Sequence, residues 1–232
     1  MPATKLVLLP NFIAGIEKDL LPPAVQKVVL SLEGLFAESD REAKRYLRHF
    51  LPREKVDILP IALLNEHTRD LPSLLALMEG KTWGLISDAG LPVIADPGSK
   101  LVYLAKEVGV TIQALLGPSA IILALLLSGL EGQRFSFHGY LPKEDKALIA
   151  RIHELEKRSK EDKATQIWIE APYRSKKMQE LLLQHLKSHT LLCVAKNILH
   201  PEEEVITKEV RYWKQHHFSL KKEPAVFLLY SY

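Results

Sequence analysis

Two short turns of acidic and small residues lie within the segment Ser87–Gly98. The first is Asp88-Ala89-Gly90 and the second is Asp96-Pro97-Gly98, and an apolar run that ends at Ser87 precedes both. A carboxylate in such a turn accepts hydrogen bonds from hydroxyl or amine groups, and glycine lets the backbone approach a ligand closely. Open α/β sheets bind ligands outside the carboxyl ends of their strands, where such loops lie. The segment therefore predicts a ligand site, although two ordinary strand-to-helix turns would have the same composition.

A third segment with suitable chemistry is Gly117-Pro118-Ser119-Ala120, which precedes an apolar run. Small residues at the start of a helix leave room for a bound group beside unpaired backbone N–H donors. A plain helix N-terminus with proline in its first turn explains the same residues. The phosphate-binding patterns G-x-G-x-x-G and G-x-x-x-x-G-K-[ST] do not occur in the sequence, so a nucleotide phosphate is weakly supported.

The bulk composition is that of an ordinary soluble globular protein. The 232 residues are 47% hydrophobic and 25% charged, which excludes a disordered or fibrous chain. The formal net charge is +3, from 31 Lys and Arg against 28 Asp and Glu. That excess is too small to indicate a nucleic-acid-binding protein, and a local basic patch would matter more than the sum.

The sequence favours a reducing compartment without metal or membrane. Its single cysteine, Cys193, lies in an apolar run and is expected to be a buried strand residue rather than a nucleophile. No His or Cys cluster has zinc-site spacing, and His216-His217 has no partner ligands nearby in the sequence. No secretory signal is evident, and the longest wholly apolar run, Ala120–Leu127, is too short to cross a bilayer. We therefore expect a cytoplasmic protein.

These candidate residues need strands and helices to position them, and the chain alternates between the two types of pattern. Strands are expected at Lys5–Leu9, Leu35–Ala37, Val56–Leu59, Trp83–Ser87, Thr111–Leu115, Gln166–Glu170, Leu191–Ala195, Val205–Glu209 and Ala225–Tyr230. Helices are expected at Arg41–Phe50, Leu71–Met78, Ser99–Val108, Pro118–Leu127, Lys143–Lys163 and Tyr173–Lys187. The last two expected strands look like neighbours. This pattern predicts an N-terminal α/β domain with a parallel sheet, residues 1–117, and a C-terminal α/β domain with a mixed sheet, residues 118–232.

The ordered motifs SDAGLPVIADPG, LLGPSA, SGL and FSFHGYLPKE together resemble one class of enzymes. They are similar to the tetrapyrrole-methylase class of S-adenosylmethionine-dependent methyltransferases, and most like the family that methylates a cytidine ribose 2′-oxygen of small-subunit ribosomal RNA. Further similar segments are Ala37-Glu38 with Arg41, Asn65-Glu66-His67, Glu170–Arg174, and Lys196 with His200 and Glu202-Glu203. The resemblance spans residues 5–230 and is most specific from 84 to 142.

The sequence departs from that family at its first loop. The family usually has A-T-P-I-G-N-L-x-D after the first strand, where this chain has Leu9–Gly15. Leu116 also stands where the family's L-P-G-P-S-A has proline, and Ser39-Asp40 replaces the usual Asp-Thr. The cofactor-side motifs are thus kept, while the substrate-side motifs are altered.

The resemblance implies a fold, a cofactor and an assembly. The fold would be two α/β domains of the tetrapyrrole-methylase type, with S-adenosylmethionine in the cleft between them and a homodimer as the usual assembly. The apolar helix that begins at Ala120 could help form a dimer interface, and core packing explains it equally well. The cofactor contacts implied are Leu9, Asp88, Ala89, Gly90, Leu91, Asp96, Ser119, Ala120, Ala171, Pro224 and Ala225.

Methylation of a ribose hydroxyl would need a group that takes up the hydroxyl proton. The candidates are Glu38, Glu66 and His67; the ordinary pKa of histidine, ~6.5, suits the task, whereas a carboxylate needs a raised pKa. A loop end at Glu66-His67 and a helix N-terminus at Glu38 would explain the same residues without catalysis. Arg41 and Arg45, on a helix that also carries Lys44 and Arg48, would suit RNA phosphates, and a solvated helix face is the alternative. Tyr140, in the FSFHGYLPKE motif, is a further candidate for substrate contact.

Three functions remain open at this point. The first is methylation of ribosomal RNA, with the small ribosomal subunit as partner. The second keeps the cofactor but changes the acceptor to a tetrapyrrole, a modified protein residue or another small molecule, which the altered first loop would suit. The third is a non-catalytic protein that binds S-adenosylmethionine as a sensor or scaffold.

Overall fold

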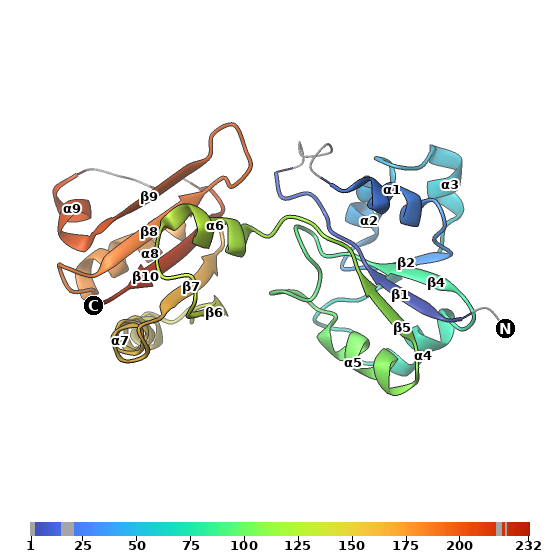
Figure 1. The fold of residues 1–232 in the computed structure, drawn as a ribbon, viewed down its shortest axis with the longest axis horizontal. Helices are drawn as coiled ribbons and strands as arrows, with labels where there is room; N and C mark the ends of the chain where they lie inside the picture. The colour runs from blue at the N-terminus through green and yellow to red at the C-terminus, as the bar shows by residue number, and fades with distance from the viewer. Residues whose placement is uncertain (1–2, 15–20, 217–219, 221) are drawn as a thin grey trace. The chain divides into compact units, whose positions relative to one another are not determined.

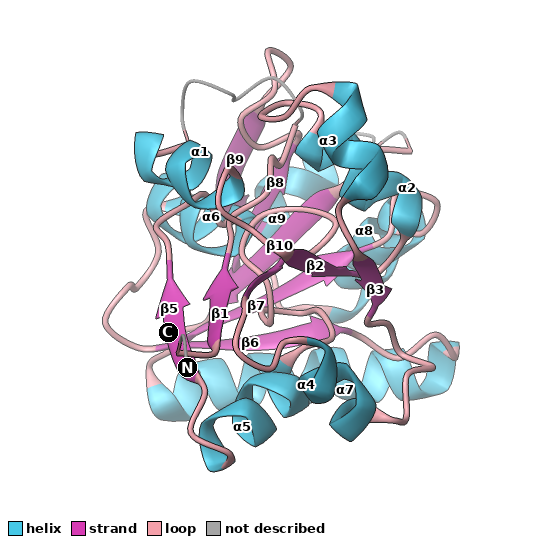
Figure 2. Ribbon diagram, turned by 90° about the vertical axis from the view of Figure 1, so that its right-hand side faces the viewer, coloured by secondary structure: helices cyan, strands magenta, loops and turns pink. Residues whose placement is uncertain are grey.

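Five short parallel strands and five helices lie within residues 3–119 in the computed structural model, which describes residues 3–14, 21–216, 220 and 222–232 (Figure 1). The chain divides into two compact units, Met1–Ser119 and Ala120–Tyr232. Each unit has its own five-stranded sheet and its own apolar cores, so each is described separately. Figure 2 shows the strands of each sheet with helices packed beside them.

The sheet of the first unit is entirely parallel, with the strand order β3-β2-β4-β1-β5. Its strands are β1 (Lys5–Leu8), β2 (Gly34–Ala37), β3 (Ile61–Leu63), β4 (Thr82–Leu85) and β5 (Thr111–Ala114). Its helices are α1 (Pro23–Val29), α2 (Asp40–Leu47), α3 (Arg53–Ile58), α4 (Leu71–Leu77) and α5 (Ser99–Glu107). A parallel sheet is covered on both faces, and its inner strand β2 is accordingly apolar and buried at every position.

Two apolar cores cover the two faces of this sheet. One contains Val25 of α1, Tyr46 of α2 and Val56 of α3, packed with Val7 and Leu35 of the strands. The other is built from the opposite-facing strand residues, together with Met78 after α4 and Leu101 of α5. Helices α1, α2 and α3 therefore lie on one face, and α4 and α5 on the other, as Figure 1 shows.

The second unit has a mixed sheet with the order β6-β7-β10-β8-β9, in which only β6 and β7 pair in parallel. Its strands are β6 (Phe135–Tyr140), β7 (Thr165–Glu170), β8 (Leu191–Lys196), β9 (Glu204–Glu209) and β10 (Ala225–Tyr230). Its helices are α6 (Ala120–Ser128), α7 (Asp145–Asp162), α8 (Ser175–His185) and α9 (Val210–Gln215). Helix α6 packs on one face, while α7, α8 and α9 pack on the other.

Two expectations from the sequence are wrong. Val56–Leu59 is not a strand: helix α3 covers Arg53–Ile58, and the strand β3 begins three residues after it. Pro52 precedes the first turn of this helix, and an ion pair of 3.7 Å joins Arg53 to Asp57 one turn later, both of which favour a helix. The strands β9 and β10 are not neighbours either, because β8 lies between them and pairs with both.

Cys193 lies on β8 with its side chain fully buried, as expected, and burial raises the pKa of its thiol to about 11. Within the described residues, no helix has both the length and the apolar character needed to span a membrane. The same part of the chain holds no group of three or more His, Cys, Asp and Glu side chains arranged to bind a metal ion.

Candidate functional site

All five strands of the first unit end at one edge of its sheet, because they run parallel. The loops that follow them bring most of the predicted site residues of this unit to that edge. Glu38 follows β2, Glu66-His67 follow β3, and Asp88 follows β4, while Ser119 comes after β5. Motifs that are far apart in the sequence thus lie together at the carboxyl end of this sheet.

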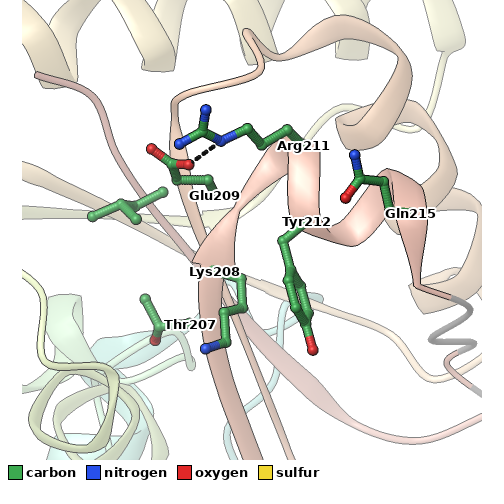
Figure 3. A pocket seen from close by; sticks show the side chains of 7 residues that line it. Thr207, Lys208, Glu209, Arg211, Tyr212 and Gln215 are labelled. Carbon is green, nitrogen blue, oxygen red and sulfur yellow. Dashed lines mark hydrogen bonds and ion pairs between the residues drawn. The ribbon is translucent and has the colours of Figure 1, made fainter.

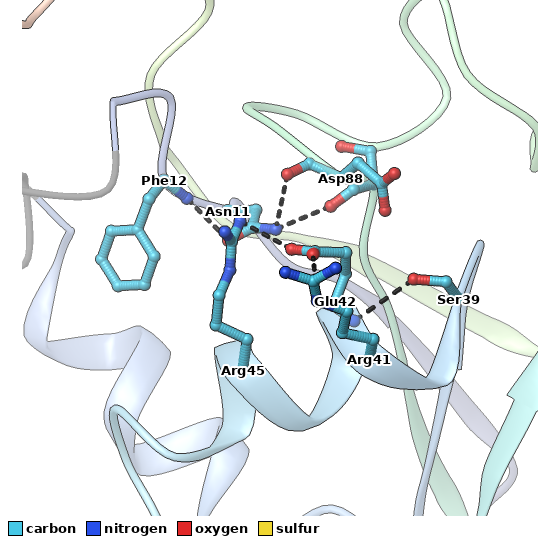
Figure 4. Close-up of polar contacts among 8 residues, drawn as sticks. Asn11, Phe12, Ser39, Arg41, Glu42, Arg45 and Asp88 are labelled. Carbon is cyan, nitrogen blue, oxygen red and sulfur yellow. Dashed lines mark hydrogen bonds and ion pairs between the residues drawn. The ribbon is translucent and has the colours of Figure 1, made fainter.

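The side chain of Asn11, which follows β1, holds the loop that follows β4 (Figure 4). Its Nδ2 donates to the carbonyl oxygens of Ser87 at 2.8 Å and Asp88 at 3.1 Å. Its backbone N–H donates to the carbonyl oxygen of Gly90 at 2.7 Å. Asn11 is only 3% exposed, so its side chain is shielded from solvent; its bond to Ser87 is buried and its bond to Asp88 is partly buried. The sequence did not single out this residue, because backbone acceptors leave no mark on residue types.

Glycines make the close approach of these loops possible. Gly90 has a φ of +70°, and a Cβ added there would lie 3.3 Å from the carbonyl oxygen of Pro118. A Cβ added at Gly117 would lie 2.0 Å from the Cβ of Pro10. The loops after β1, β4 and β5 therefore pack directly on one another, and the two glycines of the predicted motifs are required by that packing.

Glu38 and Asp96 form a carboxyl pair at the centre of the edge. Burial first, and then the charge and hydrogen bond of Glu38, raise the pKa of Asp96 to about 7. Burial first, and then the charge of Asp88, raise the pKa of Glu38. Two carboxyl groups joined by a hydrogen bond share one proton. The pair can therefore give up or take up a proton near neutral pH, which is the property that acid–base catalysis needs.

Helix α2 places a second set of charges beside Asp88. The Ser39 hydroxyl caps the helix by accepting from the N–H of Glu42 at 3.2 Å. Glu42 forms an ion pair of 2.6 Å with Arg45, and Figure 4 shows both beside Asn11 and Asp88. Burial first, and then the charge of Glu42, raise the pKa of Asp88, while Arg45 lowers it.

The predicted basic residues of α2 lie on the surface with acidic partners. The Arg41 side chain is 91% exposed and its Nε lies 3.9 Å from a Glu42 carboxylate oxygen. The Arg45 side chain is 64% exposed. Lys44 pairs with Asp40 at 2.8 Å. The positive charge of these basic side chains is therefore partly neutralised by acidic residues of the same helix.

The other candidates of this unit differ in their surroundings. Glu66 and His67 are exposed and form a loose pair of 3.5 Å with each other. Glu66 is near enough to Glu38 for its charge to raise the pKa of Glu38, although less than burial and Asp88 do. Leu9, in contrast, has a fully buried side chain in the apolar core. Ala89 is exposed and Leu91 is partly buried.

Three predicted residues of the second unit meet at one end of its central strands. Ala225, the first residue of β10, pairs with Glu170 of β7 on one side and with Lys196 of β8 on the other. Ala171 directly follows Glu170, and Pro224 directly precedes Ala225. Tyr140, at the end of β6, is 60% exposed, and Ala120 is the first residue of α6.

Charged side chains hold this end of the second sheet. The Glu170 side chain is fully buried; one oxygen accepts from the N–H of Ala171 at 2.8 Å, and the other lies 3.3 Å from Arg174. Lys196 pairs with Glu204 at 2.9 Å and with Glu223 at 3.6 Å. The backbone around Ala171 and Pro224 is thus fixed by ion pairs on both sides.

A cavity of about 400 Å³ also opens on the second unit, at β9 and α9 (Figure 3). It is lined by Leu191, Thr207, Lys208, Glu209, Arg211, Tyr212 and Gln215. The Lys208 ammonium lies 5.2 Å from the centre of the Tyr212 ring. None of the predicted site residues lines this cavity, so it adds nothing to the candidate site.

Comparison with curated proteins gives the family. A relative from Vibrio cholerae serotype O1, named ribosomal RNA small subunit methyltransferase I, is 30% identical over 210 residues, which make up 88% of this chain and 70% of the relative. The chain belongs to the ribosomal RNA small subunit methyltransferase I family. A member of this family from Halalkalibacterium halodurans is 35% identical over 161 residues, or 68% of this chain and 53% of that protein.

The chain spans about half the length of the first of these relatives: 53% of the Halalkalibacterium halodurans protein and 54% of one from Xylella fastidiosa. No protein-family model matches the chain. Membership of the ribosomal RNA small subunit methyltransferase I family therefore rests on the curated relatives, and confirms the resemblance seen in the sequence motifs.

Solved structures show that this member of the ribosomal RNA small subunit methyltransferase I family has the tetrapyrrole-methylase fold. Diphthine synthase matches with a TM-score of 0.63 and 14% identity, over 97% of this chain and 89% of that one. Uroporphyrin-III-C-methyltransferase from Thermus thermophilus matches with a TM-score of 0.56 and 17% identity, over 98% and 94%. The expected fold class, two α/β domains of this type, is confirmed.

Proposed function

We propose that this protein transfers the methyl group of S-adenosylmethionine to small-subunit ribosomal RNA, and that the acceptor is a ribose 2′-oxygen. The relatives' shared name supports the RNA substrate. The observation that carries the chemistry is the Glu38–Asp96 pair, which holds a proton near neutral pH beside the Asp88 turn. The likeness to tetrapyrrole methyltransferases, at 12–17% identity, supports the fold alone and gives no support to a tetrapyrrole acceptor.

The residues at this edge fit S-adenosylmethionine by their chemistry. That molecule supplies an electrophilic methyl group on a positively charged sulfur, and it also carries an ammonium group and ribose hydroxyls. Asp88 and Ala89 are exposed in a turn that can accept hydrogen bonds from such groups, and the adjacent Gly90 has no side chain to obstruct them. Oε1 of Glu38 is buried and has no hydrogen-bond partner among the described residues, so an acceptor is free for a ligand. We propose that Leu91, Asp96, Ser119 and Ala120 make further contacts with S-adenosylmethionine. Leu9 would form part of the apolar surface beneath the bound cofactor.

The Glu38–Asp96 pair is the proposed proton acceptor. Methylation of a hydroxyl would form an O–CH3 bond while the S–CH3 bond of S-adenosylmethionine breaks and the neutral thioether S-adenosylhomocysteine leaves; the O–H bond also breaks and releases one proton. With its shared proton lost above a pH of about 7, the pair is ready to take up that proton. Glu66 and His67 lie at the exposed rim of the same edge, where we propose that they help to orient the acceptor rather than replace the pair.

The remaining roles are also proposals. Arg41 and Arg45 would contact RNA phosphates from the exposed side of α2, and Tyr140 would contact the substrate from β6. Ala171, Pro224 and Ala225 would contribute cofactor contacts through their backbone, which the surrounding ion pairs fix. A ribosomal substrate implies a cytoplasmic protein. We also propose that the protein is a homodimer, which sedimentation analysis of its mass in solution would test. Leu126 and Leu127 of α6 are exposed and could contribute to such an interface.

Transfer of a radiolabelled methyl group to small ribosomal subunits tests the proposal. The subunits should come from a strain that lacks this gene, so that the acceptor is unmodified. We expect labelled ribosomal RNA, with the label surviving alkaline hydrolysis in a dinucleotide, because a 2′-O-methyl group blocks cleavage of the adjacent phosphodiester. Labelling of free tetrapyrroles with none of the RNA would refute the RNA substrate, and label on a base would refute the 2′-oxygen.

A further inference from the structure

The side-chain amide of Asn11 makes three hydrogen bonds to the backbone around it. Both donated bonds of Nδ2 go to neighbouring peptides of one loop, at the carbonyl oxygens of Ser87 and Asp88, 2.8 and 3.1 Å away. Its Oδ1 accepts from the N–H of Phe12 at 2.8 Å. Because one end of the amide faces an N–H and the other faces two carbonyls, only one orientation of the group satisfies all three contacts.

These contacts fix the direction of two peptide planes. In a trans peptide the C=O and the N–H point in opposite directions. Since the carbonyls of Ser87 and Asp88 point toward Asn11, the N–H groups of Asp88 and Ala89 point away from it. The backbone N–H of Asp88 lies near enough to the Glu38 carboxylate to lower the pKa of Glu38.

We infer that Asn11 is a positioning residue, which directs the N–H groups of Asp88 and Ala89 toward Glu38 and toward the bound methyl donor. This inference rests on the proposed function for the identity of that ligand. Asn11 touches neither reacting atom; it acts through the peptides that it holds. The first loop departs from the family's usual sequence at this point, but through Asn11 it still positions the loop that follows β4.

An amide is needed at this position because two carbonyl oxygens face it. An aspartate of the same shape would place a negative charge against them and could donate only when protonated. An alanine would leave the buried carbonyl of Ser87, and the partly buried carbonyl of Asp88, without this partner. The variants Asn11→Asp and Asn11→Ala therefore separate the loss of the donors from the effect of charge.

The matched control is Gln166→Glu in the second unit. Gln166 is also buried, at 1% exposed, and its Nε2 donates to the backbone carbonyl of Ala164 at 3.0 Å. The same change from amide to acid is thus made where no predicted cofactor contact depends on it. Loss of stability without loss of binding is what a purely structural role would give.

Two measurements test the inference. Calorimetry at pH 8 should show the dissociation constant for S-adenosylmethionine raised about tenfold or more in Asn11→Asp, with a smaller increase at pH 5.5, where the introduced carboxyl group can be protonated and donate again. Asn11→Ala should be weakened equally at both pH values. Gln166→Glu should bind as the wild type does.

Amide hydrogen exchange without any ligand supplies the second measurement. We expect the N–H groups of Asp88 and Ala89 to exchange at least tenfold faster in Asn11→Ala than in the wild type, and unchanged in Gln166→Glu. The inference would be overturned if the wild type binds S-adenosylmethionine and both Asn11 variants bind it with the same affinity and show the same amide exchange rates. Failure of the wild type to bind S-adenosylmethionine, with the exchange effect present, would overturn the proposed function and leave the positioning of the loop intact.

Discussion

The carboxyl groups of Glu38 and Asp96 are joined by a hydrogen bond, although one follows β2 and the other lies beyond β4. Neighbouring parallel strands bring them together, since β2 pairs with β4 and both end at the same edge. Two acids that share a proton in a partly buried place titrate as a unit rather than as separate groups. The pH dependence expected of activity and of stability follows from that unit.

Replacement of either acid should change the pH dependence of methyl transfer. In the wild type kcat/KM should rise with pH and level off above about 7, because burial and Glu38 raise the pKa of Asp96 to about 7. Asp96→Asn and Glu38→Gln should lower kcat by about 10²-fold or more if the pair is the general base. Rates measured from pH 5.5 to 9 check this, and an unchanged profile in both variants would exclude the pair as the base.

Protein stability should depend on the same group with the opposite sense. The pKa of Asp96 rises on folding, from its ordinary 3.8 to about 7, chiefly through burial. The folded state therefore holds more protons between these values, and this contribution to the unfolding free energy falls as pH increases from about 4 to about 7. Urea unfolding at pH 5 and pH 8 should show Asp96→Asn gaining stability relative to the wild type at the higher pH. A constant difference would contradict this assignment.

Asp88→Ala should weaken the binding of S-adenosylmethionine. Hydrogen bonds to a charged group contribute about 1.5–3 kcal/mol, so the dissociation constant should rise by roughly 10- to 100-fold. Asp70→Ala is the control: Asp70 caps α4 by accepting from the N–H of Ser73 at 3.1 Å, and its loss should cost about 1 kcal/mol of stability without affecting binding. Calorimetry and thermal unfolding separate the two effects; equal binding by both variants would remove Asp88 from the site.

Gly117→Ala should damage the packing of the loops. An added Cβ would lie 2.0 Å from the Cβ of Pro10, and both are held by neighbouring strands. We expect a loss of about 1–3 kcal/mol in unfolding free energy and weaker cofactor binding. Gly132→Ala is matched in chemistry but has no heavy atom within 4 Å, so its effect should stay within about 0.5 kcal/mol. Equal stability of the two variants in urea would show that the loop moves aside freely.

Arg41→Ala and Arg45→Ala test the surface of α2. If these side chains contact phosphates, each change should raise KM for the ribosomal subunit several-fold, leave kcat nearly unchanged and reduce the salt dependence of KM. Arg53→Ala supplies the comparison, because Arg53 is equally exposed and ion-paired but lies on α3. Parallel behaviour of all three variants would indicate a general charge effect rather than a contact.

Site residues could be predicted from the sequence where the side-chain type itself indicates the chemistry, and could not where the role depends on contacts with the backbone. Asp88 and Asp96 were expected as ligand-site residues because their turns follow an apolar strand, and both lie at the strand ends. Asn11 could not be found in this way, since its partners are backbone carbonyls. The pairing of Glu38 with Asp96 depends on strand order, which local patterns do not contain.

The secondary structure was predicted wrongly, or missed, where few side chains of the element are buried. The run Val56–Leu59 alternates like a strand, but Val56 is the only buried side chain of α3. Strand β6 was missed because its first two residues are exposed and its pairing with β7 shifts register between Phe137 and Tyr140. Strands buried along most of their length, such as β4 and β10, were found within a residue or two of their bounds.

The position of β1 has a consequence for the order of folding during synthesis. This strand is made before the other four strands of its sheet, yet it lies inside the sheet, with β4 on one side and β5 on the other. A nascent chain that has not reached Thr111 leaves one edge of an apolar strand unpaired, which invites aggregation. The loops after β1, β4 and β5 interlock only once that last strand is added. Until the residues after Ala114 have left the ribosome, the emerging protein has Asp88 and Asp96 but lacks the loop packing that positions them.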